Sequence, residues 1–266
     1  MSLGIHLARW ELVPDGEPIE TRSSLLLAVR CNGEPAMLKI AREEEERRGG
    51  ALMAWWAGDG AARVVARHGA ALLLERVSGP LSLADMVASG QDDGATRILC
   101  AVAARLHAPR PEPQPDLMPL SCWFEALAPA ARTHGGVLAE ADAMARGLLA
   151  EPRDVVVLHG DIHHGNVLDG GVRGWLAIDP KGLLGERTFD FVNILRNPAS
   201  TALASGRFLR QVELLANAAA LERRRLLAWT LAFAGLSASW CLADGTPADL
   251  DFGIARLAAE ALGKLG

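Results

Sequence analysis

The sequence is most informative at His159–Asn166, which reads HGDIHHGN, and at Ile178-Asp179-Pro180, which follows it. Asp161 and Asn166 have the spacing D-x-x-x-x-N, and Asp179 lies thirteen residues beyond Asn166. An apolar run just before His159 indicates a short buried strand, and a glycine-rich turn between two later apolar runs indicates a hairpin. An Asp and an Asn five residues apart are common, but the order of strand, loop, hairpin and second aspartate is much more specific.

Transfer of a phosphoryl group is the chemistry that these residue types suit. The reaction needs a carboxylate that orients and deprotonates the attacking hydroxyl group. It also needs oxygen ligands for the Mg²⁺ that bridges the β- and γ-phosphates. We therefore predict that Asp161 is the catalytic base and that Asn166 and Asp179 bind Mg²⁺. The alternative is a turn-rich loop in which Asp and Asn only cap the local backbone.

Lys39 lies in the middle of the apolar run Ala36–Ile40, where a charge must be paired or must face a cleft. We expect it to contact the α- and β-phosphates of ATP while a helix glutamate holds it. Glu46 is the predicted partner because it lies nearest the apolar part of the next helix, but each glutamate of the run Glu43–Glu46 remains possible. An edge-strand lysine is the structural alternative.

Two further segments are predicted to contact the nucleotide. Leu72–Val77, followed by Gly79, has the pattern of a strand that runs into a hinge between lobes. Its backbone would offer a carbonyl and an N–H group to adenine, which makes Glu75 and Val77 the expected contacts. No G-x-G-x-x-G motif precedes Lys39, and the corresponding turn is Thr21–Ser24. The hydroxyl and N–H groups of Ser23 and Ser24 would cover the phosphates.

The patterns along the chain divide it into two parts. Residues 1–77 combine one helical pattern with alternating apolar runs, expected as strands at 24–30, 36–40, 62–66 and 71–75. Residues 78–266 are mainly helical in their spacing, with helices expected at 95–108, within 120–149 and within 208–265. We expect an α+β, two-lobed protein-kinase-like fold with a small β-rich nucleotide-binding lobe and a larger helical catalytic and substrate-binding lobe.

Composition limits the classes of partner. The net charge of −5 argues against a nucleic-acid partner, which normally requires a basic face, and is compatible with a cationic acceptor. No apolar run reaches the roughly 18 residues that a membrane span needs, and no signal peptide is recognisable. We expect a cytoplasmic protein without a membrane partner. The four widely spaced cysteines predict neither a disulfide framework nor a metal site, and the oligomeric state stays open.

The histidines of the central loop permit a second interpretation. His159, Asp161, His163 and His164 form an H-x-D-x-H-H string that a metallohydrolase could use as metal ligands. That interpretation needs further ligands from other strands and leaves Lys39 and the two-lobed pattern unexplained. It is therefore the weaker hypothesis.

The chain resembles the aminoglycoside phosphotransferase family, and within it the branch of streptomycin 6-kinases and hydroxyurea phosphotransferases. The resemblance covers nearly the whole chain and includes the catalytic loop, which many small-molecule kinases share. It also includes ARLHAP at Ala104–Pro109, WLAIDP at Trp175–Pro180 and GERTFD at Gly185–Asp190. The run from Trp175 to Arg187 is much more diagnostic of this branch than the catalytic loop is. The resemblance implies that Asp161 is the catalytic base, that Asn166 and Asp179 bind Mg²⁺ and that Lys39 binds ATP.

The resemblance also implies an acceptor. It predicts transfer of the γ-phosphoryl group to a hydroxyl group on the streptidine ring of streptomycin, which inactivates the antibiotic. This ring carries two guanidinium groups, and an acidic pocket would suit them. The candidate acceptor-binding residues are Glu186, Asp190, Trp240 and Asp244, with Asp249 and Asp251 as further carboxylates.

Two positions differ from the pattern of that family. Gly165 stands where a glutamate is usual, and Lys181 stands where an uncharged residue or a histidine is usual. Loss of an acid and gain of a base beside the metal ligands disfavour a dication. The alternative is therefore a kinase of another small metabolite, such as a sugar, a cyclitol or a hydroxyurea-like acceptor. Whether ATP or GTP is preferred stays open.

Overall fold

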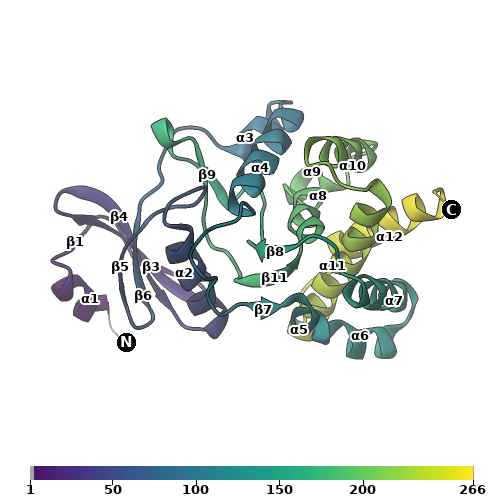
Figure 1. Ribbon diagram of the computed structural model, residues 1–266, viewed down its shortest axis with the longest axis horizontal. Helices are drawn as coiled ribbons and strands as arrows, with labels where there is room; N and C mark the ends of the chain where they lie inside the picture. The colour runs from purple at the N-terminus through teal and green to yellow at the C-terminus, as the bar shows by residue number, and fades with distance from the viewer. Residues whose placement is uncertain (1–2, 266) are drawn as a thin grey trace.

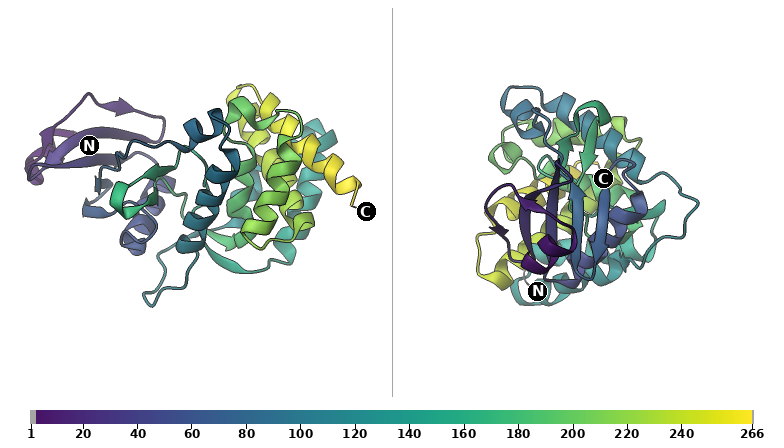
Figure 2. Two further views of the ribbon diagram at one scale, coloured as in Figure 1. Left: turned by 90° about the horizontal axis from the view of Figure 1, so that it is seen from above. Right: turned by 90° about the vertical axis from the view of Figure 1, so that its left-hand side faces the viewer.

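The structure, a computed structural model, describes residues 3–265 as a β-rich part and a helical part that follow one another along the long axis (Figure 1). The N-terminal sheet lies at one end and the helices near the C-terminus lie at the other (Figure 2). This is the arrangement that the sequence patterns predict.

The N-terminal part is built on a six-stranded antiparallel sheet in the order β1-β3-β4-β6-β5, with β2 paired to β3. Lys39 lies opposite Leu26 of β3 and Leu72 of β6, so it stands in a central strand. The strands are β1 (Val13–Pro14), β2 (Ile19–Glu20), β3 (Ser24–Cys31), β4 (Glu34–Ala41), β5 (Val64–His68) and β6 (Ala71–Glu75). Helix α1 (Leu3–Arg9) precedes the sheet and α2 (Glu44–Trp56) connects β4 to β5.

Strand β5 begins two residues later than expected from the sequence. The segment before it pairs with the C-terminal part instead, because the Ala62 N–H donates to the Ala177 carbonyl and the Ala177 N–H donates to the Gly60 carbonyl, both at 2.9 Å. These residues therefore connect the two parts of the chain by backbone hydrogen bonds.

The C-terminal part is mainly helical, with two small sheets inserted at its boundary with the N-terminal part (Figure 1). Strands β9 (Val167–Asp169) and β10 (Trp175–Ala177) form the predicted hairpin, and β7 (Met118–Pro119), β11 (Leu183–Glu186) and β8 (Val155–Leu158) form the second sheet. The helices are α3 (Leu83–Ala88), α4 (Asp92–Leu106), α5 (Leu120–Trp123), α6 (Leu127–His134), α7 (Gly136–Ala150), α8 (Val192–Leu195), α9 (Ala199–Ala202), α10 (Arg207–Ala218), α11 (Arg223–Asp244) and α12 (Asp249–Gly263), with 3₁₀ turns at Phe124–Ala126, Gly171–Arg173 and Arg187–Phe191.

Helix α2 packs against the C-terminal part. Leu52, Met53 and Trp56 belong to the large hydrophobic core that the C-terminal helices share, whereas the sheet has a smaller core of its own. Two glycines allow the close approach. A Cβ atom on Gly49 would overlap the Pro180 carbonyl oxygen, and one on Gly50 would come within 2.5 Å of Leu72 Cδ1. The helix is therefore wedged between the sheet and the segment that carries Asp179.

Helix α11 corrects one expectation from the sequence. By length and composition it could cross a membrane, with a mean hydropathy of 1.6 over its most apolar window, although no sufficiently long apolar run was expected. In the structure 78% of that window is buried, and the helix packs between α7 and α12. Its apolar surface is thus the centre of the large core, and contact with its neighbours from all sides accounts for its composition.

The packing of α11 against α7 makes a prediction about stability. A Cβ atom on Gly235 would overlap the Ala141 side chain, whereas one on the exposed Gly147 of α7 would meet no neighbour within 4 Å. Gly235→Ala should lower the free energy of unfolding by about 1–3 kcal/mol through overpacking. Gly147→Ala should raise it by roughly 0.5–1 kcal/mol through helix propensity. Urea unfolding of both variants would test this, and equal effects would contradict the packing described.

Candidate active site

The loop that carries Asp161 is held from behind by a buried carboxylate. Asp190 accepts hydrogen bonds from the backbone N–H groups of His159 at 2.9 Å and Gly160 at 2.6 Å, and its Oδ2 atom lies 2.7 Å from His107 Nε2. Only 1% of Asp190 is exposed. Gly160 has φ +85°, a conformation that favours glycine. The loop conformation therefore depends on Asp190.

Two amide side chains orient the Asp161 carboxylate. Asn193 Nδ2 donates to Oδ1 at 2.5 Å, and Asn166 Nδ2 donates to Oδ2 at 3.1 Å. Burial raises the pKa of Asp161, and the nearby Lys181 ammonium acts in the opposite direction. A carboxylate that is fixed in this way, with a raised pKa and a cavity in front of it, is suited to accept a proton.

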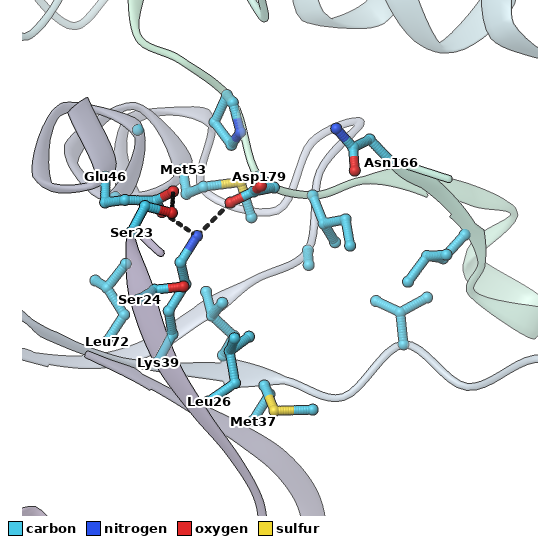
Figure 3. A pocket seen from close by; sticks show the side chains of 18 of the residues that line it. Ser23, Ser24, Leu26, Met37, Lys39, Glu46, Met53, Leu72, Asn166 and Asp179 are labelled. Carbon is cyan, nitrogen blue, oxygen red and sulfur yellow. Dashed lines mark hydrogen bonds and ion pairs between the residues drawn. The ribbon is translucent and has the colours of Figure 1, made fainter. Parts of the chain in front are cut away.

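Lys39 connects the sheet, helix α2 and the segment after β10. Its ammonium group forms ion pairs with Glu46 of α2 and with Asp179 (Figure 3). Ser23 Oγ donates to the other Glu46 oxygen at 2.7 Å, which places the Thr21–Ser24 turn beside the pair. Asp179 has φ +60°, a conformation that is uncommon outside glycine but that Asp tolerates. With this backbone conformation, the Asp179 carboxylate is placed against the Lys39 ammonium group.

The residues present suit a magnesium ion. Asn166 and Asp179 line the same cavity. The Asn166 Nδ2 atom donates hydrogen bonds to Asp161, which leaves the side-chain oxygen of Asn166, Oδ1, available for a metal ion. Burial acts to raise the pKa of Asp179, but the Lys39 ammonium outweighs it and lowers the pKa. Asp179 therefore faces a position that favours positive charge. Mg²⁺ typically takes one or two protein oxygens together with phosphate oxygens and water.

A cavity of about 360 Å³ lies between the sheet and the C-terminal part; we call it the nucleotide cavity. Its polar end contains Lys39, Asp179 and the Thr21–Ser24 turn. The apolar end is formed by Leu26, Met37, Leu72, Leu74, Leu168 and Ile178. Glu75 and Val77 also line the cavity, while the Glu75 side chain pairs with Arg173. A cavity that combines apolar side chains with an ammonium group and oxygen ligands suits a nucleotide, because the base is flat and apolar and the phosphate chain is charged.

A second cavity of about 420 Å³ lies on the other side of Asp161; we call it the acceptor cavity. Trp123, Phe233 and Trp240 supply aromatic walls, and Asp244 supplies a carboxylate. Arg22 Nη1 lies 2.5 Å from Asp244 Oδ2, so an exposed ion pair connects the Thr21–Ser24 turn to the end of α11. Asp161 thus faces a cavity that is large enough for part of a sugar-sized acceptor.

Several carboxylates that were expected to bind the acceptor lie elsewhere. Glu186 is buried against Arg225, which donates two hydrogen bonds of 2.6 Å, and Asp190 holds the catalytic loop. Burial acts to raise the pKa of Glu186, but Arg225 outweighs it and lowers the pKa. Asp251 is paired with Arg196 at 2.6 Å, and Asp249 is not among the residues lining the acceptor cavity. Of the expected acceptor residues, Trp240 and Asp244 line it.

The geometry does not support the metallohydrolase hypothesis. His159 is buried, stacks on Trp56 and has Nε2 2.9 Å from the Ile178 carbonyl oxygen, and Gly165 N–H donates to His163 Nδ1 at 2.9 Å. Within residues 3–265, no group of three or more His, Cys, Asp or Glu side chains is arranged to hold a metal ion. The histidines instead shape the loop around Asp161.

Sequence reasoning missed Asn193 and Arg196 near Asp161, and it considered Glu45 only as a partner of Lys39. Asn193 is a buried amide within the apolar run Phe191–Leu195, and that position was the signal available for it. Glu45 lies 3.1 Å from Lys181 Nζ, and Lys181 Nζ lies 3.9 Å from Asp161 Oδ2. Arg196 lines the acceptor cavity and lies over the Phe233 ring. These contacts join segments that are far apart in the sequence, so no local pattern predicts which residues meet.

Comparison with known proteins gives consistent matches. Residues 9–245 match the family described as aminoglycoside/hydroxyurea antibiotic resistance kinase. The chain is 52% identical over 245 residues to a streptomycin 3″-kinase of Klebsiella pneumoniae, covering 90% of this chain and 92% of that protein. It is 33% identical over 274 residues to a streptomycin 6-kinase of Streptomyces griseus, covering 96% and 86%.

Solved structures share this architecture, and one of them serves as an example. It is a thermostable mutant of the aminoglycoside phosphotransferase APH(4)-Ia in a ternary complex with ADP and hygromycin B. The TM-score is 0.66 at 13% identity, and the match covers 98% of this chain and 96% of that one. At this identity the likeness shows the fold alone, and it confirms the predicted two-lobed, protein-kinase-like α+β class.

The role of Asp190 in holding the loop can be tested by stability. Asp190→Asn leaves one acceptor oxygen for three donors, so a buried N–H group loses its partner. The free energy of unfolding should fall by about 1–3 kcal/mol. Asp249→Asn, an exposed change in the first turn of α12, should cost less than about 1 kcal/mol. If chemical unfolding showed the same small loss for both variants, Asp190 would not support the loop as described.

Proposed function

This chain belongs to the aminoglycoside/hydroxyurea antibiotic resistance kinase family and phosphorylates a hydroxyl group of a small molecule, and from this premise we propose that its acceptor is streptomycin. The observation that carries the proposal is the position of Asp161, whose carboxylate lies at the acceptor cavity while its partner Asn166 lines the nucleotide cavity. The relatives named as streptomycin kinases support the identity of the acceptor.

The lining of the nucleotide cavity supports roles for several of its residues. We propose that Lys39, held by Glu46, contacts the α- and β-phosphates of ATP, and that Ser23 and Ser24 cover the phosphate chain. The adenine base would lie in the apolar end, against the backbone of Glu75 and Val77. Within residues 3–265 no backbone carbonyl accepts the Val77 N–H group, which leaves this donor for the base. Residues 1–77 would then form the nucleotide-binding lobe.

The reaction follows from the position of Asp161. The acceptor hydroxyl attacks the γ-phosphorus while Asp161 orients it and takes its proton. The bond between the γ-phosphorus and the bridging oxygen breaks, and its electron pair remains on ADP. Asn166 and Asp179 would hold Mg²⁺, which, when bound, neutralises charge on the β- and γ-phosphates. Positioning therefore supplies most of the catalysis.

The acceptor cavity suits a molecule that carries guanidinium groups. Two arginines of the chain already make the contacts that such groups would make, since Arg22 pairs with Asp244 and Arg196 lies 5.5 Å from the Phe233 ring centroid. Positive and negative side chains are balanced around the cavity, so recognition would depend on the aromatic faces and on exchange of Arg22 at Asp244. A guanidinium group of streptomycin fits this chemistry.

Streptomycin has several hydroxyl groups, and the next step is to propose which of them accepts the phosphoryl group. The sequence-based expectation was the streptidine ring, as in a 6-kinase. The greater identity to a streptomycin 3″-kinase, 52% against 33%, favours the 3″-hydroxyl group instead. We therefore propose phosphorylation at the 3″ position, in the compartment where ATP is abundant, the cytoplasm.

Product analysis tests this proposal. Purified enzyme with ATP and Mg²⁺ should phosphorylate streptomycin, and phosphorus–proton NMR correlation should locate the phosphate at the 3″ position. Kanamycin, which has no guanidinium group, should be a much poorer acceptor. Phosphate at the 6 position would instead support the sequence-based expectation of transfer to the streptidine ring. If the enzyme phosphorylated only a sugar, a cyclitol or hydroxyurea, streptomycin would be excluded as the acceptor.

The role of Asp161 makes a separate prediction. Asp161→Asn keeps the shape of the side chain but removes the proton acceptor and its charge. Positioned base catalysis contributes about 10²- to 10⁴-fold, so kcat should fall within that range while the Kd for ADP is unchanged. Asp179→Asn should differ by weakening metal-dependent nucleotide binding as well. A folded Asp161→Asn enzyme with wild-type turnover would remove Asp161 from the mechanism.

A further inference from the structure

Lys181 occupies the junction of the two cavities. Among the residues that the structure describes, it alone lines both the nucleotide cavity and the acceptor cavity. Its backbone N–H donates to the His159 carbonyl at 2.7 Å, so its main chain is attached to the catalytic loop. The phosphoryl group must cross this junction to reach a hydroxyl group held by Asp161.

Two carboxylates lie beside the Lys181 ammonium group and hold it in place. Nζ lies 3.1 Å from Glu45 Oε1 and 3.9 Å from Asp161 Oδ2, and 19% of the side chain is exposed. An ammonium group has three N–H donors, and Glu45 takes one of them. Donors therefore remain for oxygen atoms of a ligand.

The other cations near the site have different partners. Lys39 is paired with Glu46 and Asp179, and it does not line the acceptor cavity. Arg196 Nη2 is paired with Asp251 at 2.6 Å, and its Nη1 atom donates to Asn193 Oδ1 at 3.1 Å. Lys181 is thus the cation whose position matches the path of the phosphoryl group.

We propose that Lys181 is a further catalytic residue, whose ammonium group contacts oxygen atoms of the γ-phosphoryl group during transfer. The inference rests on the proposed phosphotransferase function. Lys181 forms no covalent bond and keeps its protons, while the acceptor oxygen replaces the bridging oxygen of ADP and the hydroxyl proton passes to Asp161. Negative charge spreads over the oxygens of the transferring group, and a fixed cation at that point stabilises the transition state.

Three variants test the proposal by kinetics. Lys181→Met removes the charge at similar length, Lys181→Arg keeps the charge, and Lys264→Met is a control at the exposed C-terminal lysine. Removal of one such donor typically costs about 10²- to 10³-fold, so Lys181→Met should lower kcat by that factor without weakening ADP binding. Lys181→Arg should retain more activity than Lys181→Met, and Lys264→Met should match the wild type. A kcat for Lys181→Met near the wild-type value would overturn the proposal.

Ligand binding distinguishes contact with the phosphoryl group from positioning of Asp161. Calorimetry would compare ADP with ADP plus aluminium fluoride, which imitates the transferring group, in the presence of Mg²⁺ and without acceptor. The wild type should bind ADP with aluminium fluoride more tightly than ADP alone. Lys181→Met should lose this gain in affinity while its unfolding temperature is unchanged. Retention of the full gain would show that Lys181 acts only through Asp161 and would refute the inference. Because no acceptor is present, this result is independent of whether streptomycin is the substrate.

Discussion

A lysine in a central strand must be paired, and this constraint organises the molecule around it. Lys39 lies in β4, which pairs with β3 on one side and β6 on the other, and only 12% of its side chain is exposed. Its charge is balanced by Glu46 from α2 and by Asp179 from the segment after β10. One side chain therefore joins the sheet to helix α2 and to the proposed metal ligand. The desolvation cost of an unpaired ammonium group, several kcal/mol, explains why the three segments converge.

The fold was largely predictable because its signals are local. The strand runs around Lys39, the hairpin after Asn166 and the helical spacing beyond residue 90 each depend on neighbours in the sequence. The predictions failed where a segment pairs at long range. The expected strand at 62–66 begins only at Val64, because Ala62 forms a backbone hydrogen bond with Ala177 instead. The apolar α11 was not recognised as a helix enclosed on all sides.

The candidate site was predictable in part for the same reason. Asp161, Asn166 and Asp179 are spaced within one strand–loop–hairpin unit, so their proximity follows from the chain itself. The acceptor cavity is different, because Arg22, Trp123 and Asp244 come from segments separated by about one hundred residues or more. Buried ion pairs also draw carboxylates away from ligand sites. Glu186 was expected to bind the acceptor, and Arg225, which lies 39 residues further along the chain, holds it instead.

The contact between Gly49 and Pro180 has a consequence for control of the enzyme. A kinase can be switched off by swinging away the helix that carries the glutamate partner of its lysine. Here that helix is wedged against the Pro180 carbonyl, its Trp56 stacks on His159, and its apolar face belongs to the core of the other lobe. Moving it would break the core. The pairing of Lys39 with Glu46 is therefore built into the folded core, and a switch that displaces this helix would have to unfold part of that core.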